Sequence, residues 1–361
     1  MDKKSTIERI IRDAYENRVF NGAWLYAENG NIVSKGAVGS RDTEDKLPVR
    51  EDSVFYLASV SKQFTAAAVM LARRMGLLDL DDDIRRFFPD LPFEGVTVRH
   101  LLIHTSGLPH YEDWSIETAK RENAIPDNDI VLRFLRESGK GPLFAPGERF
   151  NYCNTAYCLL AETVKTVSGM TFEEFSRKHI FEPAGMSSTR IIHSRRDGVT
   201  IPGLAYGLVF EDGRYILADD SKTESWVIQL DGTHGAGHVY SNIFDLFAWD
   251  RALKNGTVLT REEQLMMYTP GLLNGGGTGG FGDEKEEIGY GFGWDILRYP
   301  HSGLAVSHGG EYPGYRTLFR RFIDDDRLLV ILNCREAKDP KAFGAFYSAM
   351  KSAAADIDPV R

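Results

Sequence analysis

Residues 57–76 read LASVSKQFTAAAVMLARRMG, and this stretch determines the fold. It predicts a helix from Ser61 to Met75 that Gly76 closes, because glycine adopts the left-handed conformation that ends many helices. Apolar side chains surround this helix almost completely: Phe64, Ala68, Leu71 and Met75 form one stripe, and Ala66, Val69 and Met70 cover much of the rest. A helix that is apolar nearly all round is buried. We therefore expect it to run through the interior of the domain.

The residues before this helix predict a terminal helix and a β-hairpin. Ser5 and Glu8 fit a capping box, in which hydroxyl and carboxylate pair reciprocally with backbone N–H groups, so we expect the first helix to begin there. Two apolar runs, 23–27 and 32–33, flank Asn29-Gly30. Both turn residues tolerate a positive φ, and this pattern is therefore typical of a hairpin.

The rest of the chain predicts helices followed by further strands. Residues from about 80 to 194 are mostly helical in pattern and are interrupted by prolines. Three later segments predict strands: 304–307, 315–323 and 327–333, the last two joined by Asp324–Asp326. A final helix is expected over about 340–356. Strands at both ends with helices between them favour an α+β fold, with one sheet assembled from the two termini and a mostly helical lobe inserted.

Composition excludes several classes of protein. The 361 residues are 42% hydrophobic and 26% charged, as in globular proteins, and the net charge of −9 with no basic cluster argues against a nucleic-acid binder. Three cysteines make no disulfide framework and show no metal-ligand spacing. No window approaches the roughly 20 apolar residues of a membrane span, and no apolar leader follows Met1. We expect a cytoplasmic protein without a membrane partner, although removal of a signal peptide would leave the same appearance.

Ser59 and Lys62 form a Ser-x-x-Lys pattern at the start of the buried helix. One helical turn separates the two side chains, so both can share a cleft. Serine needs a neighbouring base to become a nucleophile, and an ammonium group at the start of an apolar helix is poorly solvated, which favours its neutral, basic form. The pattern is short, however, and Ser348 with Lys351 on the predicted terminal helix also fits it.

A tyrosine could assist such a pair, and Tyr-x-Asn occurs at three places. Tyr15 lies at the exposed end of the first predicted helix, and Tyr240 precedes a segment that Ser241 or Asn242 is expected to cap. Only Tyr152, two residues before Asn154, follows a Pro-Gly turn, a loop setting suited to function. A phenol beside a lysine can relay the serine proton to a leaving group.

A third candidate element is His308-Gly309-Gly310, at the end of the predicted strand 304–307. Glycine there lets a substrate lie along an edge strand, and a following N–H could complete an oxyanion hole. The alternative, His301, precedes the strand and is expected to lie in a turn.

Three other patterns are expected to be structural. His234 and His238 have i,i+4 spacing, but intervening glycines argue against a helix and no nearby glutamate completes a zinc motif, so we expect no metal site and no cofactor. His104 is expected to be a hydrogen-bonding residue at a helix end. The glycine-rich stretch 274–282 lacks the preceding strand of a nucleotide-binding loop, and we expect a mobile surface loop.

The order and flanks of these motifs resemble the serine β-lactamase-like family of penicillin-recognising enzymes, which includes class C β-lactamases, D-aminopeptidases, D-Ala-D-Ala carboxypeptidases and esterases. The resemblance runs from about Gly22 to Asn333. It is carried by LASVSKQFT (57–65), LLIHTSGLP (101–109), PGERFNYCN (146–154), PAGM (183–186), and HGG (308–310) with Pro313-Gly314.

The resemblance implies a β-lactamase/transpeptidase-like fold: an antiparallel sheet flanked by the N- and C-terminal helices, with a helical lobe over the cleft. We expect a single domain over residues 1–361, with an α/β lobe from about 1–76 plus 220–361 and a helical lobe over about 77–219.

The resemblance also implies a role for each motif residue. Ser59 would be the acylated nucleophile, and Lys62 with Tyr152 the base system. The substrate would be bound by Asn154, His308, Gly309 and Gly310, and the backbone N–H groups of Ser59 and Glu311 would form the oxyanion hole. The implied activity is a cofactor-independent serine hydrolase of a small ester or amide.

Two departures bear on the substrate. Most β-lactamases and carboxypeptidases of this family carry lysine where His308 stands, and a mostly neutral histidine attracts a substrate carboxylate less strongly. Cys153 replaces a small residue, which is tolerable because cysteine behaves as a small hydrophobe. Esterase-like activity therefore ranks first, D-amino-acid amide or peptide hydrolysis second, and β-lactam hydrolysis or D-Ala-D-Ala carboxypeptidase activity third. Acyl transfer to another acceptor and a catalytically silent ligand-binding homologue stay open.

Overall fold

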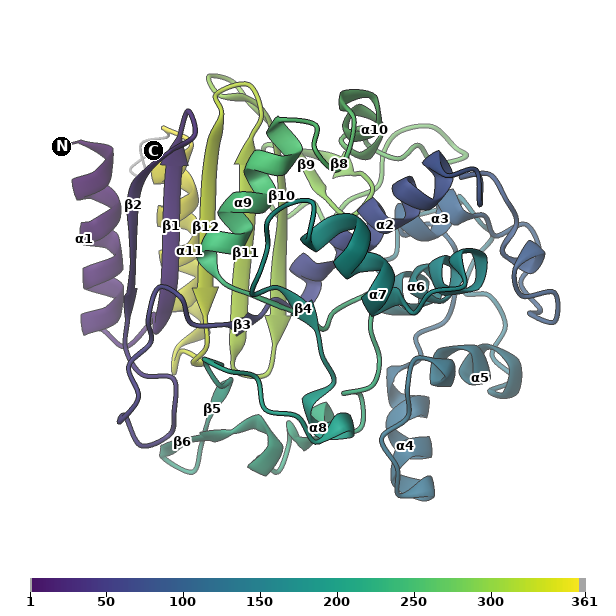
Figure 1. Ribbon diagram of the computed structural model, residues 1–361, viewed down its shortest axis with the longest axis horizontal. Coiled ribbons are helices and arrows are strands. Elements are labelled where there is room, and N and C mark those ends of the chain that lie inside the picture. Colours follow the sequence, from purple (N-terminus) through teal and green to yellow (C-terminus); the bar gives the residue numbers. More distant parts are fainter. Residues whose placement is uncertain (1, 357–361) are drawn as a thin grey trace.

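An antiparallel sheet made from both ends of the chain lies at the centre of the molecule (Figure 1). The computed structural model describes residues 2–356. Within them, seven strands follow the order β2-β1-β12-β11-β10-β9-β8. Their bounds are β1 Gly22–Glu28, β2 Asn31–Val38, β8 Glu287–Tyr290, β9 Asp295–Tyr299, β10 Gly303–Tyr312, β11 Tyr315–Phe322 and β12 Arg327–Asn333. Because β1 pairs with β12, the two termini complete one sheet, and the predicted α+β class is confirmed.

Helices cover both faces of this sheet. Helices α1 (Lys3–Glu16) and α11 (Pro340–Ala354) pack together on one face, and α2 (Lys62–Arg74) and α9 (Ile243–Lys254) lie on the other (Figure 1). Successive side chains of β12 point to opposite faces of the sheet and so pack into the cores on both sides. Leu329 and Ile331 join the core under α1 and α11, whereas Leu328, Val330 and Leu332 join the larger core on the opposite face.

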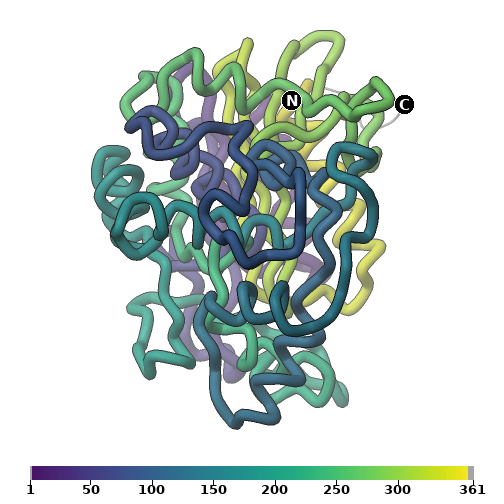
Figure 2. Tube along the Cα trace, turned by 90° about the vertical axis from the view of Figure 1, so that its right-hand side faces the viewer, coloured from purple at the N-terminus to yellow at the C-terminus, as the bar shows by residue number. Residues whose placement is uncertain are grey.

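The remaining helices gather at one end of the sheet, on the side that faces the viewer in Figure 2. They are α3 Val98–Leu102, α4 Glu112–Glu122, α5 Asp129–Glu137, α6 Asn154–Ser168 and α7 Phe172–Ser176, with α8 Ser194–Asp197 and α10 Arg261–Met267 nearer the sheet. A second sheet joins β3 (Phe55–Tyr56), β7 (Val239–Ser241) and β4 (Arg190–Ile191), and β5 (Leu208–Glu211) pairs with β6 (Arg214–Leu217). No helix among the described residues is long and apolar enough to cross a bilayer.

Helix α2 runs through the interior, as its apolar surface predicts. Every side chain from Lys62 to Ala72 is buried, and Gly76 has the left-handed φ of +73° that ends the helix. A 3-10 turn, η1 (Ala58–Ser61), leads into it, so the α-helix begins at Lys62 and not at Ser61. Met75, predicted to be part of the buried stripe, is 44% exposed.

Two further predicted boundaries were wrong. Helix α1 begins at Lys3, because Asp2 accepts the backbone N–H of Ser5 and caps the helix in place of the expected box between Ser5 and Glu8. Strand β10 continues to Tyr312, so His308 lies within the strand and not at its end. Glycines weaken the strand signal after residue 307, but β11 pairs with β10 along this whole segment and holds it extended.

Close contact between β10 and η1 brings two parts of the sequence together at Ser59. Gly310 faces the carbonyl of Leu57, and a Cβ at that glycine would overlap this oxygen and the hydroxyl of Thr317. The same carbonyl accepts a hydrogen bond of 2.7 Å from Thr317 Oγ1. The absence of a side chain at Gly310 therefore allows the strand to lie directly against the turn that carries Ser59.

We expect Gly310→Ala to lower the free energy of unfolding by about 1–3 kcal/mol, because the added methyl group meets backbone that has little room to move. The matched control is Gly309→Ala, where the nearest atom to an added Cβ is 3.9 Å away, and a change below about 1 kcal/mol is expected. Urea unfolding followed by circular dichroism measures both. Equal losses in the two variants would contradict the contact described above.

Candidate active site

The candidate site begins at the junction of η1 and α2, where Ser59 and Lys62 lie one turn apart. Lys62 Nζ is 3.0 Å from Ser59 Oγ. Ala58, directly before the serine, has a positive φ of 50° although it is not glycine. Such a conformation costs on the order of 1–3 kcal/mol and is concentrated at functional sites. The strained backbone places the serine hydroxyl beside the amine.

The amine of Lys62 is buried among acceptors. Besides Ser59 Oγ, it lies 2.8 Å from Asn154 Oδ1 and 2.9 Å from the carbonyl oxygen of Ala236. Loss of hydration lowers the pKa of Lys62 to about 7, opposed by the nearby Cys158 and Glu112. A neutral amine has two N–H groups, and Asn154 and Ala236 can accept both. Its lone pair then faces the serine hydroxyl.

Tyr152, on the loop just before α6, lies next to Lys62. Lys62 Nζ lies 4.7 Å from the centroid of its ring. Its hydroxyl is buried and has no hydrogen-bond partner in the part of the chain that the structure describes, although Ser59 is near enough to lower its pKa partly. Burial is the stronger effect and holds the pKa of Tyr152 well above its usual value. At neutral pH the phenol keeps its proton while the amine can lose one.

His104 supports the loop that carries Tyr152. It is fully buried, its φ is 57°, and its Nδ1 accepts the backbone N–H of Cys153 at 3.1 Å. Burial also lowers the pKa of His104 well below its usual value, so the ring is neutral and can accept this bond. These contacts agree with the structural role expected for His104.

Asn154, at the first turn of α6, connects the amine to a carboxylate that the sequence did not indicate. Its Oδ1 accepts from Lys62, and its Nδ2 donates to Glu112 Oε1 at 2.9 Å. The orientation of the amide is therefore determined from both sides. One hydrogen of Nδ2 is left over for a substrate carbonyl.

Residues of strand β10 line the candidate site together with Ser59. His308 is 2% exposed and burial lowers its pKa to about 3, so the ring is neutral. Its Nδ1 donates to the carbonyl oxygen of Gly309 at 2.6 Å, and its Nε2 accepts from the Tyr290 hydroxyl at 2.9 Å. Strand β9 pairs with β10 only as far as Ser307. Beyond that residue, this edge of β10 is free of β9.

A cavity of about 490 Å³ connects these groups. Seven of the predicted site residues line it: Ser59, Tyr152, Asn154, His308, Gly309, Gly310 and Glu311. Lys62 lies behind Ser59 as described above. Phe281, from the predicted glycine-rich loop, and Tyr347 also line the cavity.

Carboxylates pair with the cations of this cavity. Among the described residues that line it, Arg320 and Lys351 both bond to Glu284, and Arg316 bonds to Glu311. The cavity therefore offers no unpaired cation to a substrate carboxylate.

The competing motifs do not form a serine–lysine pair at the cavity, although Lys351 lines it. Ser348 is exposed on α11, on the far face of the sheet, and Lys351 is paired with Glu284. Tyr15 is 45% exposed at the end of α1, and Asn242 caps α9 by accepting from Phe244 and Asp245.

Sequence reasoning missed Glu112, Tyr290, Phe281 and the carbonyl of Ala236. A carbonyl has no sequence signal, and the three side chains lie on segments whose spacing from Ser59 is arbitrary. The aromatic residues near 281–294 indicate burial, but no pattern in them indicates which rings reach the cavity.

Known proteins with similar sequences indicate the family of this chain. The sequence model of the Beta-lactamase family matches residues 7–352. The chain belongs to the β-lactamase family. Penicillin-binding protein 4* of Bacillus subtilis (strain 168) is 36% identical over 337 residues, which are 93% of this chain and 72% of that protein. Esterase EstB of Burkholderia gladioli is 30% identical over 203 residues, 52% of this chain and 51% of the esterase.

Solved structures place the chain in the same fold. The crystal structure of D-amino acid amidase from Ochrobactrum anthropi SV3, complexed with L-phenylalanine amide, superposes with a TM-score of 0.79 and covers 98% of each chain at 24% identity. The predicted β-lactamase-like fold is thus confirmed for this member of the β-lactamase family.

We expect the rate at which a fluorophosphonate labels Ser59 to rise as pH increases through about 7, because only the neutral Lys62 amine can accept the serine proton. The negative charge of Glu112 raises the pKa of Lys62, so Glu112→Gln should move this rise to lower pH. Asp113→Asn, at the exposed neighbouring position, is the control and should leave the profile unchanged. A shift to higher pH in Glu112→Gln would contradict the assigned electrostatics.

Proposed function

We propose that this member of the β-lactamase family is a serine hydrolase that cleaves a small ester or amide through an acyl-enzyme on Ser59. The observation that carries the proposal is the buried Lys62 amine, 3.0 Å from Ser59 Oγ, with two other acceptors in contact with it. Its pKa of about 7 makes it a base at neutral pH. A serine beside such a base is an activated nucleophile.

The first half-reaction forms the acyl-enzyme. Ser59 Oγ attacks the substrate carbonyl carbon while its proton moves to Lys62 Nζ, and the carbonyl oxygen becomes an oxyanion. The N–H groups of Ser59 and Glu311 would stabilise that charge. Tyr152 donates its phenolic proton to the departing oxygen or nitrogen and regains one from Lys62, which leaves the amine neutral again.

The second half-reaction releases the acyl group. Water gives a proton to the same base and attacks the ester carbonyl carbon. The bond between Ser59 Oγ and the acyl carbon then breaks. Oγ takes a proton, and the carboxylic acid product departs. Another acceptor, such as an alcohol or amine, would turn hydrolysis into acyl transfer by the same steps.

Turnover of p-nitrophenyl acetate should vanish in Ser59→Ala and in Lys62→Arg, because arginine cannot supply a neutral base. The expected loss in kcat is at least about 10³-fold. The wild type should gain the mass of the acyl group during turnover, and Ser59→Ala should not. Absence of both turnover and a covalent adduct in the wild type would favour the ligand-binding homologue, and activity in Lys62→Arg would exclude Lys62 from proton transfer.

The charges of the cavity favour a neutral substrate. His308 is neutral, Arg320 and Lys351 share the carboxylate of Glu284, and Arg316 is paired with Glu311. β-Lactams and D-Ala-D-Ala peptides carry a carboxylate that would be desolvated here without a free partner. Esters therefore rank before both.

Glu112 favours a second candidate, an amide or ester that carries an α-amino group. Its Oε2 is buried and has no hydrogen-bond partner among the described residues, while Oε1 holds Asn154. An ammonium group next to the scissile carbonyl could bond to this oxygen. This chemistry matches hydrolysis of an amino-acid amide.

The wild type should hydrolyse the methyl ester of a D-Ala-D-lactate depsipeptide at least about tenfold faster, in kcat/KM, than the free acid, since an unpaired carboxylate in the cavity costs about 1.4 kcal/mol or more. His308→Lys should reduce or reverse this preference by adding an ammonium group at that wall. p-Nitrophenyl acetate, which has no carboxylate, serves as the matched control. A wild-type preference for the free acid would contradict the neutral-substrate proposal.

A further inference from the structure

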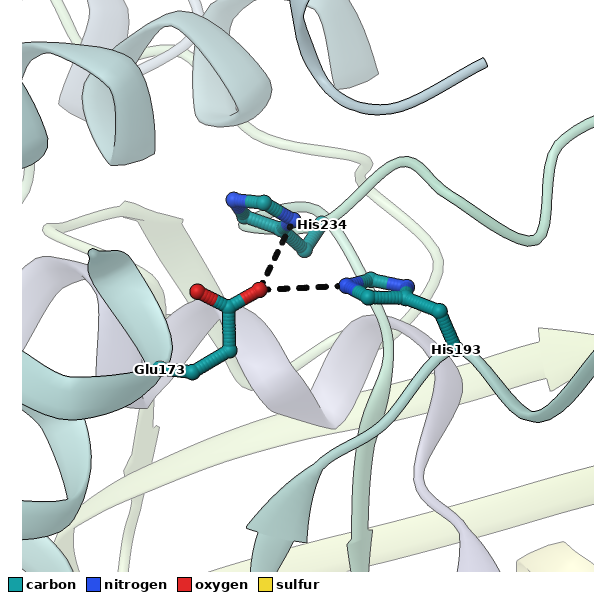
Figure 3. A group of neighbouring side chains, drawn as sticks. All are labelled: Glu173, His193 and His234. Carbon is teal, nitrogen blue, oxygen red and sulfur yellow. Dashed lines mark hydrogen bonds and ion pairs between the residues drawn. The ribbon is translucent and has the colours of Figure 1, made fainter. Parts of the chain in front are cut away.

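Three potential metal ligands, none of which lines the cavity at Ser59, lie together (Figure 3). Glu173 lies in the first turn of α7, His193 just before α8, and His234 in the loop before β7. One donor atom from each residue lies within 4.8 Å of the other two. Glu173 Oε1 is 3.1 Å from His193 Nε2 and 3.5 Å from His234 Nδ1. Figure 3 shows both rings directed at this one oxygen.

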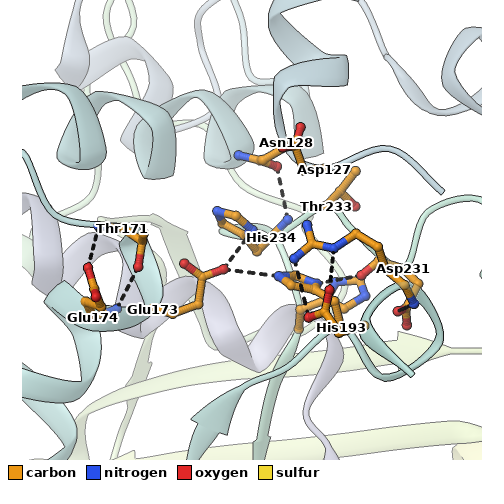
Figure 4. Close-up of polar contacts among 12 residues, drawn as sticks. Asp127, Asn128, Thr171, Glu173, Glu174, His193, Asp231, Thr233 and His234 are labelled. Carbon is orange, nitrogen blue, oxygen red and sulfur yellow. Dashed lines mark hydrogen bonds and ion pairs between the residues drawn. The ribbon is translucent and has the colours of Figure 1, made fainter. Parts of the chain in front are cut away.

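The surrounding structure orients each donor (Figure 4). Thr171 and Glu174 form a capping box that begins α7 and places Glu173 in its first turn. His193 Nδ1 lies 2.6 Å from the carbonyl oxygen of Asp231, which leaves Nε2 directed at the cluster. A ring nitrogen that donates to a backbone carbonyl is the usual support of a histidine that binds metal through its other nitrogen.

His234 is the part of the cluster that needs an explanation. It is only 6% exposed, and neither ring nitrogen has a hydrogen-bond partner within residues 2–356. Its Nε2 is 4.0 Å from Glu162 Oε1, beyond hydrogen-bond distance. Asn128 Oδ1 accepts the backbone N–H of His234 at 3.0 Å and so holds the residue in place (Figure 4). Buried polar groups are almost always hydrogen-bonded, and a bound ion or water is one explanation for an exception.

We propose that Glu173, His193 and His234 bind a divalent transition-metal ion of the zinc type. Donor atoms around a tetrahedral zinc, with bonds of about 2.0–2.2 Å, lie roughly 3.3 Å apart. The two distances from Glu173 Oε1, 3.1 and 3.5 Å, lie on either side of this value. Two imidazoles and one carboxylate suit zinc, whereas magnesium and calcium prefer all-oxygen sites.

This proposal replaces the expectation of no metal site, which rested on the spacing of His234 and His238. His238 is indeed not a partner of His234 in the cluster, because its Nδ1 contacts the Tyr56 hydroxyl at 3.4 Å. The other two ligands come from Glu173 and His193, on separate elements. No local sequence pattern connects the three positions.

A metal ion here would stabilise the loop that leads to β7. The same loop directs the carbonyl of Gly235 to Thr65 Oγ1 at 2.7 Å and that of Ala236 to Lys62 Nζ at 2.9 Å. The ion itself would not touch a substrate, since none of its three ligands lines the cavity at Ser59. We assign it a structural role: it holds the loop whose carbonyl orients the Lys62 amine.

The experiment uses the full chain without a histidine tag, freed of metal with a chelator and dialysed against Zn²⁺, Co²⁺ or Mg²⁺. We expect one equivalent of Zn²⁺ by elemental analysis, a rise in Tm of about 5 °C in excess Zn²⁺, and visible absorption bands of tetrahedral Co²⁺. Mg²⁺ should produce none of these effects.

Glu173→Gln and His234→Gln should each weaken Zn²⁺ binding at least about 100-fold, whereas the matched control His238→Gln, a buried histidine of the same loop, should bind as the wild type does. Ser59→Ala should also bind one equivalent, so the result does not depend on the proposed hydrolysis. Should a ligand variant fail to fold, His193→Gln replaces it in the dialysis series. No stoichiometric Zn²⁺ in the folded wild type, or undiminished binding in the ligand variants, overturns the proposal.

Discussion

The candidate active site depends on the loss of hydration at the Lys62 amine. Lys62 lies at the start of a helix that is buried on every side, and water cannot reach it to stabilise an ammonium ion. Asn154 and Ala236 accept hydrogen bonds from the amine and keep it directed at Ser59 without supplying a full negative charge. The interior position of α2, which is primarily a matter of packing, thus also sets the acid–base chemistry of the serine.

The sheet places the remaining parts of the site with respect to this amine. Because the termini complete the sheet, β10 is held between β9 and β11 near the candidate nucleophile. Gly310 lets β10 approach η1, and the end of β9 at Ser307 leaves the following edge open to a substrate. A wider residue at 310, or a longer β9, would close the same space. The binding edge therefore results from where pairing stops as much as from which residues are present.

Much of the fold was predictable because its signals are local. The Asn29-Gly30 hairpin, the apolar helix α2 and the apolar strand 327–333 each depend on neighbouring residues. Ser59 and Lys62 are also close in sequence, on η1 and at the start of α2, and the motif around Tyr152 could be recognised from its resemblance to a family. Glu112 and the Glu173–His193–His234 cluster could not be predicted, because packing of α4, α7 and two loops brings them together. The length of β10 was missed since pairing with β11, not propensity, extends it past Gly309.

The loop before β7 connects the candidate active site with the Glu173–His193–His234 cluster. A carbonyl oxygen orients an amine only if its own position is fixed, and a loop with Gly235 and Gly237 has little intrinsic rigidity. Hydrogen bonds to Thr65 and Asn128, and the 3.5 Å contact of His234 Nδ1 with Glu173 Oε1, supply the missing constraints. Loosening any of them would enlarge the range of positions that Ala236 samples and weaken its bond to Lys62. The buried histidines would then influence proton transfer by limiting motion, without contacting the reacting atoms.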